Sequence, residues 1–206
     1  MERKEDVPQP KEILIGQPAF RVLEVLAQVD PDIREFCFAQ YDEENEGEES
    51  FFHLSPKESL SGGLEGIMTN AADQGFVVGL CSPVSLESAS STTHLKHLLM
   101  FDIDLPPSPE NIDIAVQRIK QDLGVKSGFL IVSSEQGMHF LGGNLYVEDE
   151  LPQLYGQSLL MKGSRGENLV DSRNVGHILE SRKYVATLRI SGRKGQKDIP
   201  KIIGII

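Results

Sequence analysis

The sequence predicts a mixed α/β (α+β) fold in two lobes. Its 206 residues suffice for one medium domain or two small lobes with a buried core. Segments with helical periodicity alternate along the chain with short apolar runs of strand length. The stretch 98–141 is expected to run strand, helix, strand, turn, strand. We therefore expect a loose arm over 1–17, an N-terminal αβ lobe over 18–93 and a second lobe over 94–206.

The elements of the first lobe follow from apolar spacing and from the residues that start and stop helices. The tetrapeptide at 55–58 has the pattern of a capping box with proline at the first helical position. In chain order, we expect a helix over 19–29, strands over 33–41 and 51–54, a helix from 56 to Gly75, a strand over 76–81 and a Ser/Thr-rich loop over 82–93.

The second lobe is predicted from the same signals. Ser108-Pro109 starts a helix that Gly124 ends, and a Gly-containing turn over 133–137 separates two apolar strands. In chain order, we expect a strand over 98–105, a helix over 108–123, strands over 129–132 and 138–141, helices over 151–161 and 171–182, and strands over 184–190 and 199–206.

The apolar run at 98–101 ends in two carboxylates, Asp102 and Asp104. In a strand, side chains alternate between faces, so the two carboxylates share one face and Ile103 takes the other. Adjacent carboxylates repel each other, and a divalent cation such as Mg²⁺ or Mn²⁺ relieves that repulsion through hard oxygen ligands. The alternative, commoner for an isolated Asp-x-Asp, is a strand that simply ends in a polar turn.

A second candidate feature is the segment from Ser133 to His139. A serine at the end of one strand and a histidine in the next can converge across a short turn. Their hydroxyl and imidazole, together with the turn amides, form a reasonable cradle for phosphate oxygens. The alternative is an ordinary turn with a partly buried histidine.

Two further polar residues interrupt apolar stretches. Asp171 follows Leu169-Val170 as a third carboxylate, and its alternative role is to N-cap the following helix. Arg189 lies inside a predicted strand between leucine and isoleucine, and arginine suits bidentate contact with phosphate. The basic, glycine-containing loop that follows, over 192–197, fits either a phosphate-binding loop or a solvated turn.

The charge of the chain is unevenly distributed. The net charge of −11 argues against broad non-specific nucleic-acid binding. An acidic run occupies 42–49, whereas the segment from Lys162 onward has ten Lys/Arg against four Asp/Glu, which is compatible with a local phosphate-binding surface. We expect Cys37 and Cys81 to be buried free thiols, and His53 to be a strand surface residue and not a ligand.

No apolar run approaches the roughly 20 residues needed to span a bilayer. The first residues, which are mostly charged, lack the apolar core of a signal peptide. We therefore expect a cytoplasmic protein without membrane contact.

The order of these motifs resembles the catalytic core of the archaeo-eukaryotic primases, the primase–polymerase superfamily. Phe101–Asp104 is similar to its hydrophobic-DxD/E motif, 133–139 to its Ser/His motif and Val170-Asp171 to its hydrophobic-Asp motif. The segment 68–78 resembles a stretch before the first motif in plasmid and phage relatives. Leu188-Arg189, with the later Pro200, resembles bacterial ligase-associated polymerase domains. The resemblance spans roughly 60–204.

The resemblance implies a two-lobed core in which an RRM-like lobe packs on the N-terminal lobe, with the active site between them. It implies that Asp102, Asp104 and Asp171 bind two divalent ions, Mg²⁺ or Mn²⁺, for nucleotidyl transfer from NTP or dNTP to a 3′-hydroxyl. The residues implied to contact the triphosphate are Ser133, His139 and Arg189.

The partners implied by the resemblance are a nucleoside triphosphate and a single-stranded nucleic-acid template, which the chain holds alone or with a partner protein. Two alternatives stand beside this enzyme hypothesis. The first is a catalytically inactive nucleotide- or metal-binding regulatory module with the same fold. The second is an interaction protein that docks through the acidic run 42–49.

Overall fold

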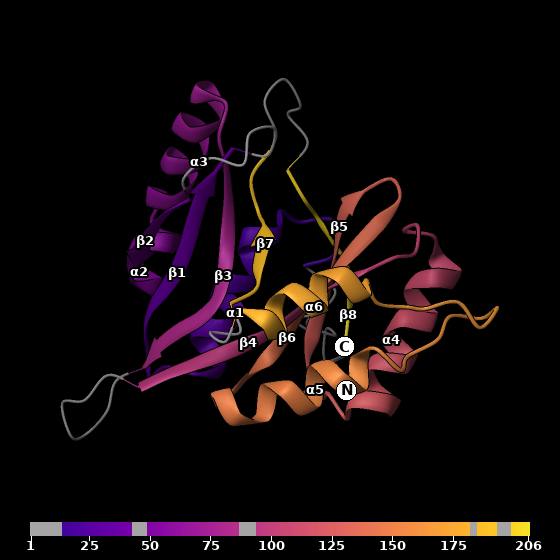
Figure 1. The fold of residues 1–206 in the computed structure, drawn as a ribbon. Coiled ribbons are helices and arrows are strands. Elements are labelled where there is room, and N and C mark those ends of the chain that lie inside the picture. Colours follow the sequence, from indigo (N-terminus) through magenta and orange to yellow (C-terminus); the bar gives the residue numbers. More distant parts are fainter. Residues whose placement is uncertain (1–13, 43–48, 87–93, 182–184, 193–198) are drawn as a thin grey trace, which may run out of the picture.

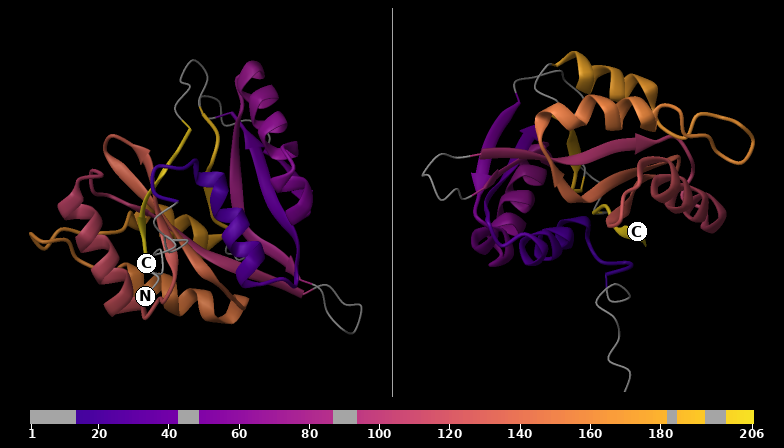
Figure 2. Two further views of the ribbon diagram at one scale, coloured as in Figure 1. Left: turned by 180° about the vertical axis from the view of Figure 1, so that it is seen from behind. Right: turned by 90° about the horizontal axis from the view of Figure 1, so that it is seen from below.

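The predicted mixed α/β fold is confirmed by a computed structural model of the chain. Its strands form one eight-stranded sheet in which every pairing is antiparallel. Helices lie on both sides of β4 (His94–Ile103) when the molecule is viewed from below (Figure 2). The structure describes residues 14–42, 49–86, 94–181, 185–192 and 199–206.

The sheet has the strand order β2-β1-β3-β4-β6-β5-β8, with β7 paired to β3 outside this path (Figure 1). Its strands are β1 (Ile33–Tyr41), β2 (Ser50–Leu54), β3 (Val77–Leu86), β4, β5 (Gly128–Ser134), β6 (Gly137–Tyr146), β7 (Thr187–Arg189) and β8 (Ile202–Ile205). The helices are α1 (Val22–Val29), α2 (Pro56–Leu60), α3 (Gly63–Gln74), α4 (Pro109–Leu123), α5 (Leu151–Ser158) and α6 (Ser172–Glu180), with short 3₁₀ turns at Ala19–Arg21 and Glu148–Glu150.

Strands β3 and β4 pair only over a short stretch, from Pro83–Leu86 to His94–His97. Beyond it the two strands separate, and β7 pairs with the free part of β3 through Gly79, Leu80 and Cys81. Figure 1 shows β7 lying between β3 and the β4–β6 pair. This insertion brings the C-terminal part of the chain beside the end of β4 that carries the two aspartates.

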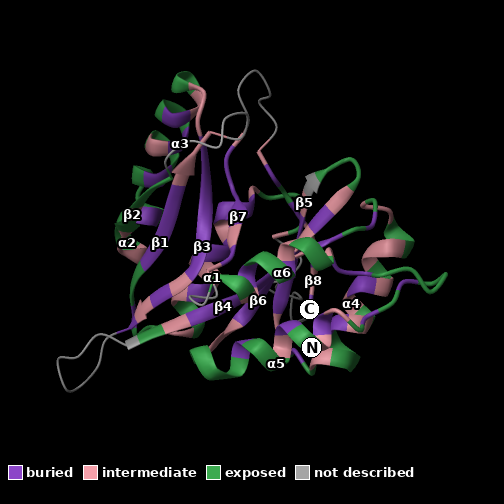
Figure 3. Ribbon diagram, in the orientation of Figure 1, coloured by how far each residue is buried: buried purple, intermediate pink, exposed green. Residues whose placement is uncertain are grey.

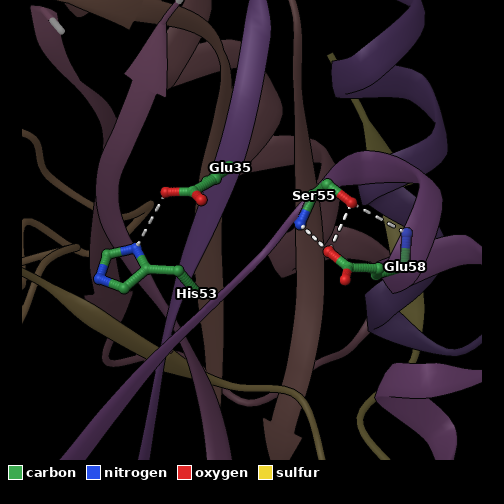
Figure 4. Close-up of polar contacts among 4 residues, drawn as sticks. All are labelled: Glu35, His53, Ser55 and Glu58. Atoms are coloured by element: carbon green, nitrogen blue, oxygen red, sulfur yellow. Dashed lines mark hydrogen bonds and ion pairs between the residues drawn. The ribbon is translucent and has the colours of Figure 1, made fainter.

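The capping box predicted at Ser55 is present (Figure 4). The hydroxyl oxygen of Ser55 accepts from the Glu58 N–H at 3.3 Å, and the Ser55 N–H donates to the Glu58 carboxylate at 2.9 Å. The single helix predicted up to Gly75 is divided in two, because Gly62 adopts a left-handed conformation with φ of 89°. Gly75, with φ of 86°, ends the second part as expected.

Several predicted boundaries differ from the structure; for example, the strand predicted over 138–141 is β6, which runs from Gly137 to Tyr146. Ser82 to Leu86 continue β3 instead of forming a loop, because Val84 to Leu86 pair with both β1 and β4 and the Ser82 N–H donates to the Ala186 oxygen. The C-terminal strand predicted over 184–190 is shorter and consists of Thr187–Arg189. Residues 14–17 of the predicted loose arm hydrogen-bond to β8, with the Gly16 N–H donating to the Ile202 oxygen at 2.7 Å. Other predicted segments lie outside the described part of the chain, namely 1–13, 43–48, 87–93 and 193–198.

The buried apolar residues form one main cluster on both sides of β4, reaching from α1 to β8. Figure 3 shows the central strands largely buried and the outer helix faces exposed. Phe101 and Phe140 pack against each other across β4 and β6, with ring centroids 4.9 Å apart. The sheet and the main core include residues from both halves of the chain. They do not mark a boundary between two lobes, so the predicted division between residues 93 and 94 stays a prediction.

The positions of the two cysteines and of His53 agree with the sequence-based expectations. Cys37 and Cys81 are buried free thiols. His53 is a surface residue of β2, with its Nδ1 4.0 Å from the Glu35 carboxylate (Figure 4). None of the helices that the structure describes has the length and apolar character needed to cross a membrane.

Candidate active site

The pairing of β4 with β6 brings together two of the predicted site residues. In this antiparallel register Asp102 lies directly opposite His139. Across such a pair the side chains are neighbours on one face of the sheet. The Nδ1 atom of His139 hydrogen-bonds to the Oδ1 atom of Asp102. The His139 side chain is 15% exposed and that of Asp102 38% exposed, so the pair borders solvent.

The third predicted carboxylate is placed beside the first by backbone hydrogen bonds. The Asp171 N–H donates to the Asp102 carbonyl oxygen at 3.0 Å, and the Asp104 N–H donates to the Leu169 oxygen at 3.0 Å. Ile103 and Val170 form the antiparallel bridge between these two bonds. The hydrophobic-Asp segment therefore aligns with the end of β4 like a short extra strand.

Asp171 also has the capping role that its sequence position allowed. Its Oδ1 accepts from the Arg173 N–H at 2.8 Å, which caps the first turn of α6. The Arg173 guanidinium, which is largely exposed, lies 3.4 Å from the same oxygen. The structure thus shows the capping role of Asp171, and its role as a third metal-binding carboxylate stays a prediction.

The electrostatic environment of Asp104 is unfavourable for its negative charge. Burial raises the pKa of Asp104, the negative charge of Asp171 raises it further, the Arg173 guanidinium opposes this, and Asp102 adds a smaller increase. A raised pKa means that the ionised carboxylate is destabilised where it stands. The end of β4 is therefore a place where a cation would be stabilised.

A small pocket of about 10 Å³ lies beside the Asp102–His139 pair. Its volume is near the minimum that holds one water-sized guest. The pocket is bordered by the ends of β4 and β6, by α6 and by β7, and its lining residues are Met100, Phe101, Asp102, His139, Asn174, Ala186, Thr187 and Leu188.

Asn174 was not among the residues predicted from the sequence. It is the third residue of α6 and lines the pocket next to Asp102 and His139. The only sequence signal for it is its spacing, because a residue three positions after an N-cap lies one turn into the helix and can share a face with the cap.

Of the other two predicted phosphate ligands, the structure describes the side chain of Arg189 alone. Ser133 belongs to β5, and its side chain lies outside the described part. Arg189 is 8% exposed, and its Nη1 donates to the Ser191 oxygen at 3.3 Å. It directly follows Leu188, a pocket residue, so it lies close to the site along β7.

The chemistry of these side chains fits a divalent cation, although they do not enclose one in this arrangement. Among the described residues, no three His, Cys, Asp or Glu side chains are close enough to hold a metal ion. The fit rests on the raised pKa of Asp104 and on the buried Oδ1 of Asn174, which lacks a hydrogen-bond partner within the described chain. Carboxylate and amide oxygens suit Mg²⁺ or Mn²⁺.

Comparison with known protein families identifies the class of protein. The model of the AEP-like family, described as archaeo-eukaryotic primase 1D-like, matches residues 58–201. This match covers more than half of the chain, and the chain belongs to the archaeo-eukaryotic primase family. The family resemblance predicted from the motif order is therefore confirmed. A search of curated proteins finds no match.

Two solved structures similar to this chain are structures of the primase RepB′. The catalytic domain of primase RepB′ in complex with initiator DNA is 12% identical, with a TM-score of 0.45, and the alignment covers 90% of this chain and 84% of that one. A second structure of primase RepB′ is 11% identical, with a TM-score of 0.42, covering 89% of this chain and 55% of that one.

Proposed function

We propose that this chain is a metal-dependent nucleotidyltransferase of the primase–polymerase type, which adds nucleotides from NTP or dNTP to a 3′-hydroxyl on a single-stranded nucleic-acid template. The observation that carries the proposal is the backbone hydrogen bond from Asp171 to Asp102, beside the Asp102–His139 pair. It unites the family's three motifs at one end of β4. The family match over 58–201 supports the same reaction class.

In this proposal the carboxylates of Asp102, Asp104 and Asp171 hold the divalent ions, Mg²⁺ or Mn²⁺. When bound, such ions activate the attacking hydroxyl and neutralise the charge that develops on the leaving group. The 3′-oxygen forms a bond to the α-phosphorus, the bond to the bridging oxygen of the β-phosphate breaks, and pyrophosphate leaves. The hydroxyl proton passes to solvent.

The remaining predicted residues bind the nucleotide. His139, fixed by Asp102 through Nδ1, keeps Nε2 as its second polar atom for a triphosphate oxygen. Ser133 would contact the same phosphates from the neighbouring strand β5. Arg189 would supply charge-assisted phosphate contacts after a side-chain rearrangement, since in this structure it is turned toward Ser191.

Template binding requires positive charge to contact the phosphates, and the net charge of this chain is negative. With a net charge of −11, the protein repels nucleic acid at long range. We propose that the template is held by the basic C-terminal segment, alone or together with a partner protein.

The test is primer synthesis and extension with Mn²⁺ or Mg²⁺, NTPs or dNTPs and a single-stranded template. Asp102→Asn keeps the shape of the side chain but removes its charge. Because it removes a direct ligand, we expect activity to fall by at least about 100-fold, beyond the 10–100-fold typical of outer-shell partners. Asp113→Asn, which changes an exposed carboxylate on α4, is the matched control and should keep full activity. Activity that survives in Asp102→Asn, or that is absent from the wild-type protein, contradicts the proposal.

The alternative function is a catalytically inactive module that binds a nucleotide or metal. The absence of a three-ligand cluster among the described residues favours an inactive module over an enzyme with two metal ions. Calorimetry with Mn²⁺ and NTP separates the two functions. Binding without product formation supports the inactive module, whereas binding with primer synthesis supports the enzyme.

A further inference from the structure

Asn174 has a buried polar atom without a partner. Its Oδ1 is inaccessible to solvent and accepts no hydrogen bond within the part of the chain that the structure describes. Leaving a buried acceptor unpaired costs about 1–3 kcal/mol. Such atoms are rare in folded proteins, and each one calls for an explanation such as a functional role or a bound ion or water. The position of Asn174 in the pocket beside Asp102 indicates what this role is.

The reason for the missing partner is visible in the backbone. In a capping box, the Glu or Gln side chain at the third helical position accepts from the N-cap N–H. Glu58 does this with Ser55 at the start of α2 (Figure 4). At the start of α6 the N-cap is Asp171, and its N–H already donates to the Asp102 carbonyl oxygen at 3.0 Å. The alignment with β4 therefore makes the Asp171 N–H unavailable as a donor to Asn174.

The pocket that Asn174 lines is suited to a cation. The Oδ1 atoms of Asn174 and Asp102 are both acceptors, and Asp102 offers a second carboxylate oxygen besides the one that His139 contacts. A guest between these oxygens must be a hydrogen-bond donor or a cation. The pocket of about 10 Å³ admits a guest no larger than a single water or ion.

We propose that Asn174 is a further ligand of the divalent-cation site at Asp102 and supplies a neutral side-chain oxygen to Mn²⁺ or Mg²⁺. This inference rests on the proposed metal-dependent function. A neutral oxygen adds coordination without adding charge to the end of β4, where backbone hydrogen bonds already align Asp171 with Asp102. Amide oxygens are ordinary ligands for hard divalent cations.

The first experiment is calorimetry with Mn²⁺ alone, without nucleotide or template. Asn174→Ala removes the oxygen, and we expect Mn²⁺ affinity to fall about 10–100-fold. Asn174→Asp keeps an oxygen in place and adds a negative charge, so it should bind Mn²⁺ at least as tightly as the wild type. Asn70→Ala, at an exposed position on α3, is the matched control and should leave the affinity unchanged.

The second experiment is thermal unfolding with and without Mn²⁺. Without the ion, Asn174→Asp should unfold at a lower temperature than the wild type, because it adds a carboxylate beside the existing ones. With Mn²⁺, its unfolding temperature should rise by more than that of the wild type. Because an added carboxylate attracts Mn²⁺ through its charge alone, the loss of affinity in Asn174→Ala decides whether the native amide oxygen is a ligand.

Two outcomes overturn the inference: an Asn174→Ala variant that binds Mn²⁺ like the wild type, or an Asn174→Asp variant that binds it no better than Asn174→Ala. Either result leaves the proposed function intact if the wild type binds Mn²⁺. Failure of the wild type to bind Mn²⁺ instead removes the metal dependence of the proposed function, and the inference with it.

Discussion

The main-chain N–H of Asp171 donates to the carbonyl oxygen of Asp102 at 3.0 Å. This bond joins two segments that are far apart in the sequence and places their carboxylates at the same end of β4. The same N–H is therefore not available to the side chain of Asn174, whose Oδ1 has no hydrogen-bond partner among the described residues. One backbone contact thus aligns Asp171 with the end of β4, next to the pocket that Asn174 lines.

Removing the charge of Asp104 is expected to stabilise the protein. Its pKa is raised in the folded state, mainly by burial and by Asp171. The folded state therefore holds this proton more tightly than the unfolded state, and the destabilisation appears as pH rises through the unfolded pKa of about 3.9. Asp104→Asn should raise the unfolding temperature at pH 7, and the gain should disappear below pH 4.

The same variant should respond less to a cation. Mn²⁺ should raise the unfolding temperature of the wild type and have a smaller effect on Asp104→Asn, since one ligand is lost. Scans across pH with and without Mn²⁺ measure both effects. An Asp104→Asn variant that is less stable than the wild type at pH 7 would show that the carboxylate is not under electrostatic strain.

Asp171 combines a cap and a charge, and two substitutions separate them. Asp171→Ala loses the cap on α6 and should destabilise the protein by about 1 kcal/mol, whereas Asp171→Asn keeps a capping oxygen and should cost much less. Both variants lose the charge, so both should weaken Mn²⁺ binding. Denaturant unfolding and Mn²⁺ titration check the pair, and equal stability of the two variants would contradict the capping role.

The Arg173 guanidinium is expected to compete with a cation at the site. It lies near Asp171 and lowers the pKa of Asp104, opposing the effect of burial. Arg173→Gln should therefore bind Mn²⁺ a fewfold more tightly at low salt, and the gain should shrink as salt screens the charge. Stability should change by less than about 0.5 kcal/mol, because the side chain is largely exposed. Arg118→Gln, on the exposed surface of α4, is the control and should have no effect on binding.

His97 should make the protein sensitive to acid. It is 4% exposed, lies opposite Tyr146 on β6 and has an unpartnered Nδ1 within the described chain. Burial lowers the pKa of His97, and Glu148 only partly opposes this. The unfolded state therefore takes up the proton first, and stability should fall as pH drops below the unfolded value of about 6.5.

The test for His97 is unfolding by denaturant between pH 7 and pH 5. His97→Gln removes the titrating group and should flatten this pH dependence, while His53→Gln, at an exposed position on β2, should retain it. An unchanged pH profile in His97→Gln would assign the acid sensitivity to other groups.

Local patterns were sufficient for most elements of this fold. The capping residues Ser55 and Ser108, and the glycines that end α3 and α4, act within a few residues and were readable from the chain. The exceptions are segments whose conformation depends on pairing with strands that are distant in the sequence. Ser82 to Leu86 carry no clear strand pattern, yet Val84 to Leu86 have partners on both β1 and β4.

The sequence by itself determined the family, the strand that ends in Asp102 and Asp104, and the order of the motifs, because alternation and spacing are local properties. The tertiary structure alone decided that His139 lies opposite Asp102, since this depends on the register of β4 and β6. It also decided that the Asp171 N–H bonds to Asp102 and leaves Asn174 without a donor. The hydrogen bond from the Asp171 N–H to Asp102 forms only when these two distant segments of the chain come together, so it cannot be read from local sequence patterns.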